Sequence, residues 1–491
     1  MIHHNVLHPG KYPQPARSVS VSIGSVEQWG IALGCTVVVL GLYLGLLWRV
    51  FPASETDVGG DYVYVAWQMS HGAALYRDVL GQQTPLLYLL GAVAYRLWAR
   101  PDVFLAVALG VRALTTVAVF ALARASRFPP AAACGAALIY LILPMGFFFG
   151  ARFEPNLLIT LGGVLCTLAL TDLSPQRAAL AGFGCGLSIM AKLTFAPLVL
   201  VLAIYLLITR RSLLVPFVAS TVGVLCLAIA VGLATVGPAF IEGALLAHVG
   251  STLSGANFVV SLQYVWRVEG FTVLAAIVGA VFAARQVGPG RLLALYLLGG
   301  LATLGATISV GSLAPEMLVG EPAIALCATF AVQRVVTIWH HHRTRRLSPR
   351  LVPLVLAALL LVVGQVLAVR DDALVLQASQ PSPQLICLVR LLHNPEYQHG
   401  PVIVPPYAAF LAQRPLVDGL SDTFNWSIRV HRGERTAEAQ AKAIITAITN
   451  KQIALIAFDD EALPPRVERA VRTLYSPTTT CASTQVFVPR A

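Results

Sequence analysis

The sequence predicts a mainly α, polytopic transmembrane protein with about eleven spans, long helices in its first outer loop and a small C-terminal α/β domain. Hydrophobic residues make up 57% of the 491 residues and charged residues only 12%, whereas soluble domains carry about 25% charged residues. Apolar runs long enough to cross a bilayer recur along the chain. The expected organisation is a cytoplasmic segment at 1–27, a transmembrane domain at 28–370 with an outer loop at 52–102, and an extracytoplasmic domain at 371–491.

A helix that crosses about 30 Å of hydrocarbon needs about 20 apolar residues. Runs of that kind lie at 28–50, 103–123, 131–149, 155–171, 213–236, 268–284, 291–310, 318–338 and 350–369. Residues 178–208 form a longer run that Lys192 interrupts, so it is either one tilted helix or two short ones. Residues 85–99 are short for a span, at about 22 Å, and they hold interfacial residue types such as Tyr88 and Trp98.

The positive-inside rule decides both doubtful segments together. We take 85–99 as a non-crossing helix and 178–208 as two crossings. Twelve arginines downstream of the first outer loop then become cytoplasmic: Arg124, Arg127, Arg177, Arg210, Arg211, Arg285, Arg291, Arg334, Arg343, Arg345, Arg346 and Arg350. Between 103 and 370 the opposite side holds only Arg152, Lys192, Arg267 and Arg370, with Arg112 in mid-span. This bias predicts a multi-pass protein of the cell membrane with a cytoplasmic N-terminus and an extracytoplasmic C-terminal domain.

Acidic residues show the opposite asymmetry. Most of those that precede residue 371 fall on or near the outer face in this topology, among them Glu269, Glu316 and Glu321. Acids contribute little to topology, so their position indicates that binding or chemistry takes place at the outer face. The net charge of +11 reflects cytoplasmic arginines, and no basic stretch interleaved with aromatic residues indicates nucleic acid as a partner.

The tail differs in composition from the rest of the chain. Apolar stretches at 401–405, 453–458 and 486–489 predict buried strands, and 434–450 and 464–474 predict helices. Cys387 and Cys481 are the cysteines outside the apolar runs, and the sequence leaves open whether they pair.

Several polar residues at the outer face are candidates for chemistry. Asp57 lies ahead of a Gly-Gly turn, and residues 62–69 fit an amphipathic helix lying on the membrane. A carboxylate fixed there could accept a proton from a hydroxyl group, and the alternative is a solvated loop carboxylate. Arg152 and Glu154 open the second outer loop, where an ordinary interfacial ion pair is the alternative.

Lys192 is a charge in an apolar stretch, which is costly and usually functional. It could hold a phosphate, and snorkelling to the outer interface is the alternative. His248 and Tyr264 fall in an expected outer loop at 240–266 and could line a cavity.

The order of these residues resembles the GT-C superfamily of membrane glycosyltransferases, in the branch of protein O-mannosyltransferases and the lipid A aminoarabinose transferase. The resemblance rests on Asp57, on Tyr62 and Tyr64, and on the stretches 72–78, 82–88, 151–155 and 182–198. It covers roughly residues 28–210 well, while 211–370 agree only in hydropathy. The tail fits loosely at 411–415 and 453–458.

The resemblance implies a hexosyl- or pentosyltransferase that moves a sugar from a polyprenyl-phosphate carrier to a lipid, glycan or protein acceptor, usually with inversion. Asp57 would be the general base, with Asp61 as its rival. Glu154 would bind the acceptor or a metal, and Arg152 and Lys192 would face the carrier phosphate. The remaining cavity candidates are Tyr64, Arg77, Asp78, His248 and Tyr264. No cofactor is certain, and a divalent cation remains open.

Three features depart from the family pattern. Val58 stands where an acid often follows the first Asp, Gln83-Thr84-Pro85 stands where many relatives have Lys-Pro-Pro, and residues 311–322 lack His, Tyr and Arg. The donor site is therefore altered, or this member is weak or inactive. A transporter or flippase of a lipid-linked saccharide and a non-catalytic envelope scaffold are the alternative functions.

Overall fold

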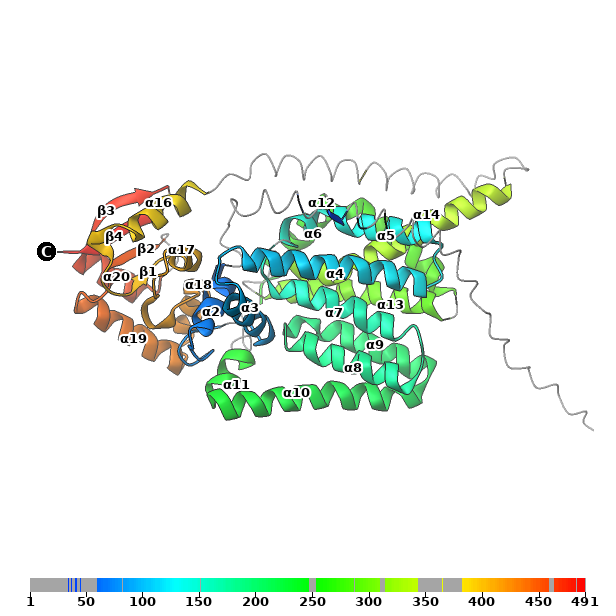
Figure 1. Cartoon of the computed structure of the whole chain (residues 1–491), viewed down its shortest axis with the longest axis horizontal. Helices are drawn as coiled ribbons and strands as arrows, with labels where there is room; N and C mark the ends of the chain where they lie inside the picture. The colour runs from blue at the N-terminus through cyan, green and yellow to red at the C-terminus, as the bar shows by residue number, and fades with distance from the viewer. Residues whose placement is uncertain are drawn as a thin grey trace, which may run out of the picture.

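A computed structural model describes residues 60–342 and 382–490, with gaps at 82, 151, 247–252, 287, 310–313, 459–462 and 483, and isolated positions before 60 and at 364. The expected spans at 28–50 and 350–369, the segment 1–27 and the boundary at 371 therefore lie outside the described residues. The described chain is an elongated helical bundle with a small α/β unit at one end (Figure 1).

Helices of the bundle run alternately toward and away from the α/β unit (Figure 1). They are α4 Val103–Ala125, α5 Pro130–Ile142, α6 Pro144–Phe149, α7 Pro155–Ala169, α8 Pro175–Ile189, α9 Ala196–Thr209, α10 Leu214–Val236, α11 Ala239–Ala244, α12 Gly255–Ala284, α13 Pro289–Ala302 and α14 Glu321–His342. Short 3₁₀ helices continue some of them, at Thr303–Ile308 and Ala314–Gly320. Five of these segments are long and apolar enough to cross a membrane, and Pro130–Ile142, Pro155–Ala169 and Leu193–Thr209 are shorter apolar helices.

The run at 178–208 is two short helices rather than one tilted helix. α8 and α9 form a hairpin whose open ends are joined by a hydrogen bond from Arg210 Nη1 to the Leu173 carbonyl at 2.8 Å. Glycine allows α8 to lie close to α10, since a Cβ at Gly182 would collide with the Phe217 carbonyl. The division of this run into two helices is therefore confirmed, and it brings Lys192 to the end of the bundle nearest the α/β unit.

The expected span at 131–149 is broken at Leu143–Pro144, between α5 and α6. Pro144 has no N–H, so the carbonyl groups of the preceding turn need another donor. Arg112 Nη2 supplies it, donating to the carbonyl oxygens of Tyr140 at 3.3 Å and Leu141 at 3.1 Å. The first free N–H of α6, that of Met145, donates to Glu269 Oε1 at 2.9 Å.

Glu321 completes this group, because it interacts electrostatically with Glu269 and Arg112. Arg112, Glu269 and Glu321 are 1%, 2% and 0% exposed. Glu269 and Glu321, which we expected on or near the outer face, are thus buried inside the bundle. In the low-dielectric interior, these side chains compensate a helix break that hydropathy alone does not reveal.

The first outer loop contains α2 Gly60–Ser70 and α3 Leu86–Leu97. They pack against each other and against the α/β unit, beside the bundle (Figure 1). The Trp67 ring meets the Phe410 ring of the α/β unit edge to face, with their centroids 5.9 Å apart. α2 is thus buried between two parts of the protein rather than lying alone on the membrane, and α3, with 12 residues, is about 18 Å long, too short to span.

The C-terminal unit contains a four-stranded sheet in the order β1-β2-β4-β3. Its elements are α16 Pro383–Leu392, β1 Val402–Ile403, α17 Pro406–Leu411, α18 Thr423–His431, α19 Arg435–Thr449, β2 Leu455–Phe458, α20 Pro465–Leu474, β3 Tyr475–Cys481 and β4 Thr484–Pro489. β1 and β2 are parallel and the other pairs antiparallel. The expected strands and helices of this unit are confirmed, whereas β3 was not expected. The pairing of Cys387 and Cys481, which the sequence left open, is present as a disulfide.

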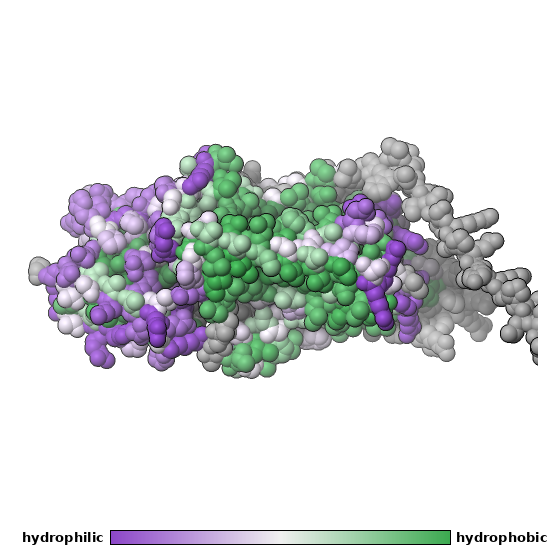
Figure 2. Space-filling model, turned by 90° about the horizontal axis from the view of Figure 1, so that it is seen from below, coloured by the Kyte–Doolittle hydropathy of each residue, from purple (hydrophilic) through white to green (hydrophobic). Residues whose placement is uncertain are grey.

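Polar surface is concentrated at the two ends of the molecule. Figure 2 shows hydrophilic residues over the α/β unit, an apolar middle, and a second hydrophilic band at the far end of the bundle. The thickness of the apolar middle follows from its helices, since α4 has 23 residues and is about 35 Å long. This profile is that of a membrane protein with one domain projecting from the bilayer.

Candidate active site

Lys192 lies in the turn between α8 and α9, where Pro197 in the first turn of α9 favours a new helix start. Its backbone is extended and its side chain is 8% exposed. The first outer loop is attached to this turn by two hydrogen bonds: Thr84 Oγ1 to the Ile189 carbonyl at 3.2 Å, and Leu86 N–H to the Met190 carbonyl at 3.1 Å. The turn thus places a buried cation directly beneath the outer loop.

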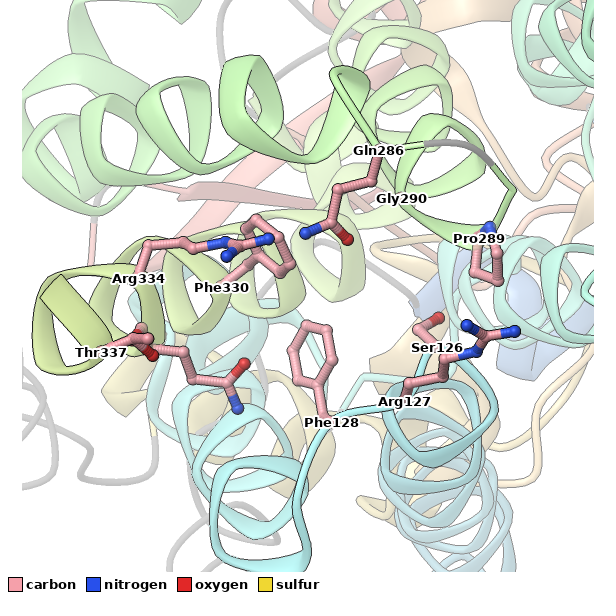
Figure 3. A pocket seen from close by; sticks show the side chains of 10 residues that line it. Ser126, Arg127, Phe128, Gln286, Pro289, Gly290, Phe330, Arg334 and Thr337 are labelled. Carbon is pink, nitrogen blue, oxygen red and sulfur yellow. The ribbon is translucent and has the colours of Figure 1, made fainter. Parts of the chain in front are cut away.

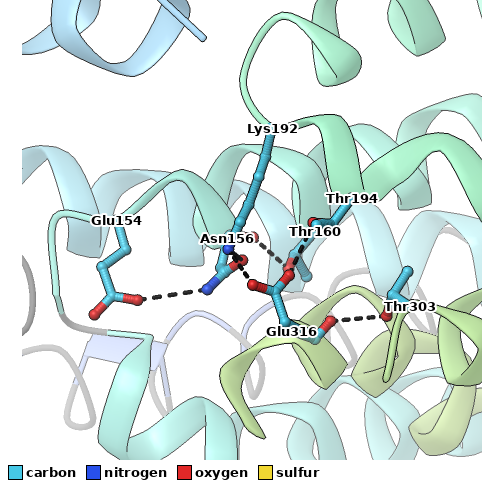
Figure 4. Close-up of polar contacts among 7 residues, drawn as sticks. All are labelled: Glu154, Asn156, Thr160, Lys192, Thr194, Thr303 and Glu316. Carbon is cyan, nitrogen blue, oxygen red and sulfur yellow. Dashed lines mark hydrogen bonds and ion pairs between the residues drawn. The ribbon is translucent and has the colours of Figure 1, made fainter. Parts of the chain in front are cut away.

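The Lys192 ammonium group has two partners (Figure 4). Nζ donates to Asn156 Oδ1 at 3.0 Å and to Glu316 Oε1 at 2.5 Å. The other oxygen of Glu316 accepts from Thr194 Oγ1 at 2.8 Å. We call Glu154, Asn156, Lys192, Thr194 and Glu316 the Lys192 cluster.

Glu316 was not a sequence candidate for the site. It lies in the segment 311–322, which we singled out only because it lacks His, Tyr and Arg. Instead of a cation or an aromatic ring, this segment supplies the carboxylate that pairs with Lys192. Thr303 Oγ1 donates to the Glu316 carbonyl at 2.8 Å and holds the segment in place. The sequence does show an acid in an expected outer loop and a lysine in an apolar run. Because the two residues are 124 positions apart, the sequence alone gave no reason to pair them.

Glu154 immediately precedes α7, with its side chain 4% exposed. Its Oε2 accepts from Asn156 Nδ2 at 3.5 Å, so Asn156 bridges Glu154 to Lys192 (Figure 4). Burial raises the pKa of Glu154, and the positive charges of Arg152 and Lys192 oppose that rise. The Arg152 guanidinium lies 4.9 Å over the Phe149 ring. The expected proximity of Arg152, Glu154 and Lys192 is present in the structure.

Asp61, in the first turn of α2, belongs to the same electrostatic environment. Burial raises its pKa well above the usual range, and the charges of Asp422 and Glu154 raise it further. The pKa of Tyr62 is raised by burial and by the same carboxylates. Three acidic side chains from the outer loop, the bundle and the C-terminal unit therefore converge, and Asp422 is the member that the sequence did not single out.

Other expected residues lie elsewhere. Tyr64 is 1% exposed, and its hydroxyl oxygen accepts from the Leu416 N–H at 2.7 Å, which joins α2 to the C-terminal unit. Arg77 and Asp78 form an exposed ion pair at 2.8 Å, in which Arg77 holds the pKa of Asp78 below its usual range. Tyr264 lies on helix α12, 37% exposed, rather than in a long outer loop.

Asp57 and His248 lie outside the described residues. Within the described part of the chain, no group of three or more His, Cys, Asp and Glu side chains is placed to hold a metal ion.

Solved structures resemble nearly the whole chain. ArnT from Cupriavidus metallidurans in the apo state aligns with a TM-score of 0.62 at 15% identity, covering 93% of this chain and 98% of ArnT. The same protein bound to undecaprenyl phosphate aligns with a TM-score of 0.59 at 13% identity, covering 95% and 99%. The Archaeoglobus fulgidus oligosaccharyltransferase in its apo form aligns with a TM-score of 0.55 at 15% identity, covering 95% of this chain and 75% of that one.

This chain has the GT-C fold. The resemblance inferred from the outer-loop motifs is thereby confirmed at the level of the fold. No family model matches the sequence, and no curated protein matches it. Within the GT-C fold, the Lys192 cluster and Asp61 lie where the helical bundle meets the outer loop and the C-terminal unit.

Proposed function

We propose that this protein is a glycosyltransferase that moves a sugar from a polyprenyl-phosphate carrier to a hydroxyl-bearing acceptor at the outer face of the cell membrane. One observation carries the proposal: carboxylates from three parts of the chain converge beside Arg152 and Lys192, at the end of the bundle where the outer loop meets the α/β unit. Acids suit proton transfer and cations suit a phosphate leaving group. The solved structure of ArnT with undecaprenyl phosphate supports a lipid-phosphate donor by analogy of fold.

In the proposed reaction, the acceptor oxygen attacks the anomeric carbon while a carboxylate accepts its proton. The bond from the anomeric carbon to the phosphate oxygen breaks, and the carrier leaves as polyprenyl phosphate. A single displacement of this kind inverts the anomeric configuration. Phosphate is already a good leaving group, so stabilisation of its charge is needed more than a strong acid.

Asp57 is the proposed base, and Asp61 remains its rival. The pKa of Asp61 is raised by burial and by Asp422 and Glu154, which favours its protonated form and also makes its carboxylate a stronger base once it is ionised. Glu154 would orient the acceptor. Asp57 lies outside the described residues, three positions before α2 in the sequence, so its role rests on the sequence resemblance.

Arg152 and Lys192 are proposed to face the carrier phosphate. Lys192 is already paired with Glu316, so a phosphate would share that ammonium group with a carboxylate. Arg152 has no carboxylate within ion-pairing distance among the described residues and lies over Phe149. We therefore assign Arg152 the larger share of donor binding and Lys192 the additional task of holding Asn156 and Glu154 in position.

The proposal also includes the side of the membrane on which each end of the chain lies. The C-terminal unit is proposed to be extracytoplasmic, because it contains the Cys387–Cys481 disulfide, and disulfides persist in oxidising compartments. The N-terminus is proposed to be cytoplasmic. Single cysteines introduced at Arg100 and Arg127 should then react with an impermeant thiol reagent from opposite sides of the membrane, and labelling from the same side would contradict the arrangement.

The test of the function is turnover by the purified full-length protein with labelled polyprenyl-phosphate sugars. Asp57→Asn should lower turnover by about 10²–10⁴-fold, the usual contribution of general-base assistance, with donor binding retained. Asp102→Asn is the matched control, because Asp102 pairs with the exposed Arg100 and is not part of the Lys192 cluster. Loss of turnover in Asp61→Asn with normal turnover in Asp57→Asn would move the base to Asp61. Absence of donor consumption by the wild-type protein with every polyprenyl-phosphate sugar offered would favour a transporter or a scaffold.

A further inference from the structure

A second polar site lies at the end of the bundle farthest from the candidate active site. It is a cavity of about 220 Å³ between the α4–α5 turn, the α12–α13 turn and α14. Figure 3 shows Arg334 and Gln286 extending across one part of the cavity, while Ser126, Arg127 and Phe128 line another part. α4 separates this end from the outer one by about 35 Å.

The polar lining of the cavity consists of hydrogen-bond donors and positive charge. The groups are the guanidinium groups of Arg127 and Arg334, the amides of Gln286 and Gln333, and the hydroxyls of Ser126 and Thr337. No carboxylate lines the cavity, and in the described part of the chain neither arginine forms an ion pair. A site lined by two positive charges and by no described acid is complementary to an anion.

Two of the lining groups have no hydrogen-bond partner in the part of the chain that the structure describes. Ser126 Oγ and Gln333 Nε2 are buried and have no hydrogen-bond partner among the described residues. Buried polar groups are normally hydrogen-bonded, so such atoms at the wall of a cavity indicate a ligand or ordered water. Pro289 and Gly290, in the first turn of α13, also line the cavity, and the positive end of that helix dipole adds to the attraction for an anion.

The surroundings of the cavity identify the kind of anion. Among the described residues near this end, Arg124, Arg177, Arg210, Arg211, Arg285 and Arg291 accompany the two lining arginines, and Asp172 is an acid of this end. The hydrophilic band in Figure 2 marks the level at which the apolar surface ends, which is the depth of lipid headgroups. Basic pockets between transmembrane helices at this depth bind phosphate-bearing headgroups.

We propose that this cavity binds a phosphate group, supplied by an anionic phospholipid headgroup of the facing leaflet or by free phosphate. Arg127 and Arg334 neutralise the phosphate from two sides, and Gln333, Gln286 and Ser126 donate hydrogen bonds to its oxygens. The volume is several times the share of about 30 Å³ that one water occupies in the liquid, so a phosphate with part of a glycerol headgroup fits. Such a ligand would fasten the α4–α5 turn, the α12–α13 turn and α14 together at the inner end of the bundle.

The proposal does not depend on catalysis, and its test uses binding. The full-length protein is purified in detergent and stripped of lipid, and the binding of phosphatidylglycerol, phosphatidylcholine and inorganic phosphate is measured by native mass spectrometry and by the rise in Tm. The wild-type protein should bind phosphatidylglycerol saturably and in preference to phosphatidylcholine. The double variant Arg127→Gln/Arg334→Gln should bind it at least about tenfold more weakly, since it loses two charge-assisted contacts.

The matched control is the double variant Arg177→Gln/Arg285→Gln, which removes the same charge from exposed positions at the same end of the molecule. It should bind phosphatidylglycerol as the wild-type protein does. A third variant, Arg127→Lys/Arg334→Lys, keeps the charge and should retain more binding than the glutamine pair, which separates a phosphate site from a folding defect.

Two results bear on the source of the phosphate and two would overturn the site. Strong binding of phosphatidylglycerol that inorganic phosphate does not displace assigns the site to a lipid headgroup. Displacement by inorganic phosphate at lower concentration assigns it to free phosphate. Equal weakening in both glutamine pairs would show a diffuse positive surface instead of a site, and equal binding of phosphatidylglycerol and phosphatidylcholine by the wild-type protein would remove the anion preference.

Discussion

The Lys192 cluster and the group formed by Arg112, Glu269 and Glu321 are alike in composition and differ in their hydrogen-bond partners. Each sets a buried cation against a glutamate from the segment that runs from the 3₁₀ helix Ala314–Gly320 into α14. Arg112 and Glu269 also bond to backbone groups freed by the break at Pro144. Lys192 and Glu316 bond to side chains, and through Asn156 they reach Glu154.

The difference shows how to distinguish a structural charge from a functional one inside a membrane domain. An intramembrane ionisable residue is a functional candidate by default. Arg112 has a sufficient structural reason, because it replaces hydrogen bonds that a proline removes. Lys192 has no such backbone role, and the groups it organises converge with acids from the outer loop and from the C-terminal unit.

Replacement of Arg112 should have the largest effect on stability. Arg112→Met leaves two buried carboxyl groups without their cation and the Tyr140 and Leu141 carbonyls without a donor. Removing one partner from a buried ionic group costs about 3–5 kcal/mol, so expression and the thermal-unfolding midpoint in detergent should fall sharply. Arg177→Met, an exposed control, should change little. A normally stable Arg112→Met protein would contradict the structural role.

A double-mutant cycle should separate the Lys192–Glu316 pair from that structural group. Lys192→Met and Glu316→Gln should each destabilise the protein, by as much as about 3–5 kcal/mol. Because each single variant leaves the other member of the pair buried without its partner, the double variant should recover about 1–3 kcal/mol of their summed cost. The exposed pair Arg472–Glu468, taken through the same cycle, should give only about 0.3–0.5 kcal/mol.

Turnover measured on these variants then sharpens the comparison. The Lys192→Met/Glu316→Gln protein should regain stability without regaining donor consumption, since it lacks the proposed phosphate contact and the support of Asn156. Recovery of both together would mean that Lys192, like Arg112, is structural.

The raised pKa of Asp61 should appear in the pH dependence of stability. A carboxyl group whose pKa is higher in the folded protein than in the unfolded chain contributes stability that is present below the unfolded value, about 3.9. That contribution is lost as the pH rises through the folded pKa. Asp61→Asn should therefore match the wild-type midpoint at low pH and exceed it increasingly as the pH rises.

Asp78 supplies the control of opposite sign. Its pKa is lowered by Arg77, so its contribution is present at neutral pH and is lost as the pH falls. Asp78→Asn should then lose a little stability at neutral pH and none in acid. Parallel pH profiles for the wild-type protein and Asp61→Asn would contradict the burial and repulsion that we assign to Asp61.

Sequence reasoning reached the fold because hydropathy and charge bias act over long stretches. It found Lys192 as a charge inside an apolar run and divided that run into two helices. It missed the break at Pro144, although the proline is visible, because the apolar run continues through it without a polar residue. It also missed β3, whose residues Tyr475–Cys481 contain a proline and three threonines and show no apolar alternation.

The sequence predicted the members of the candidate site that are close together in the chain and missed those that are distant. Arg152 and Glu154 are neighbours in the chain, so their proximity needs no fold. Glu316 and Asp422 reach the site only through tertiary structure, Glu316 across 124 residues from Lys192 and Asp422 from a different domain. Neither stands in a motif, and a lone acid in a polar stretch carries no sign of its partner.

The smallest predicted effect concerns the hydrogen bond between Tyr64 and Leu416, which joins the C-terminal unit to the outer loop beside the site. Tyr64→Phe removes the oxygen that accepts the Leu416 N–H at 2.7 Å, and an unsatisfied buried N–H costs about 1–3 kcal/mol. Tyr95→Phe is the matched control, since Tyr95 is 7% exposed, lies in the same aromatic cluster against Phe410, and makes no hydrogen bond through its hydroxyl among the described residues. Hydrogen exchange at Leu416 should quicken in Tyr64→Phe alone, with Asp422, six residues farther along the chain, held less firmly opposite Asp61. If exchange at Leu416 is equally fast in both variants, packing of the aromatic cluster, and not this hydrogen bond, holds the C-terminal unit against the outer loop.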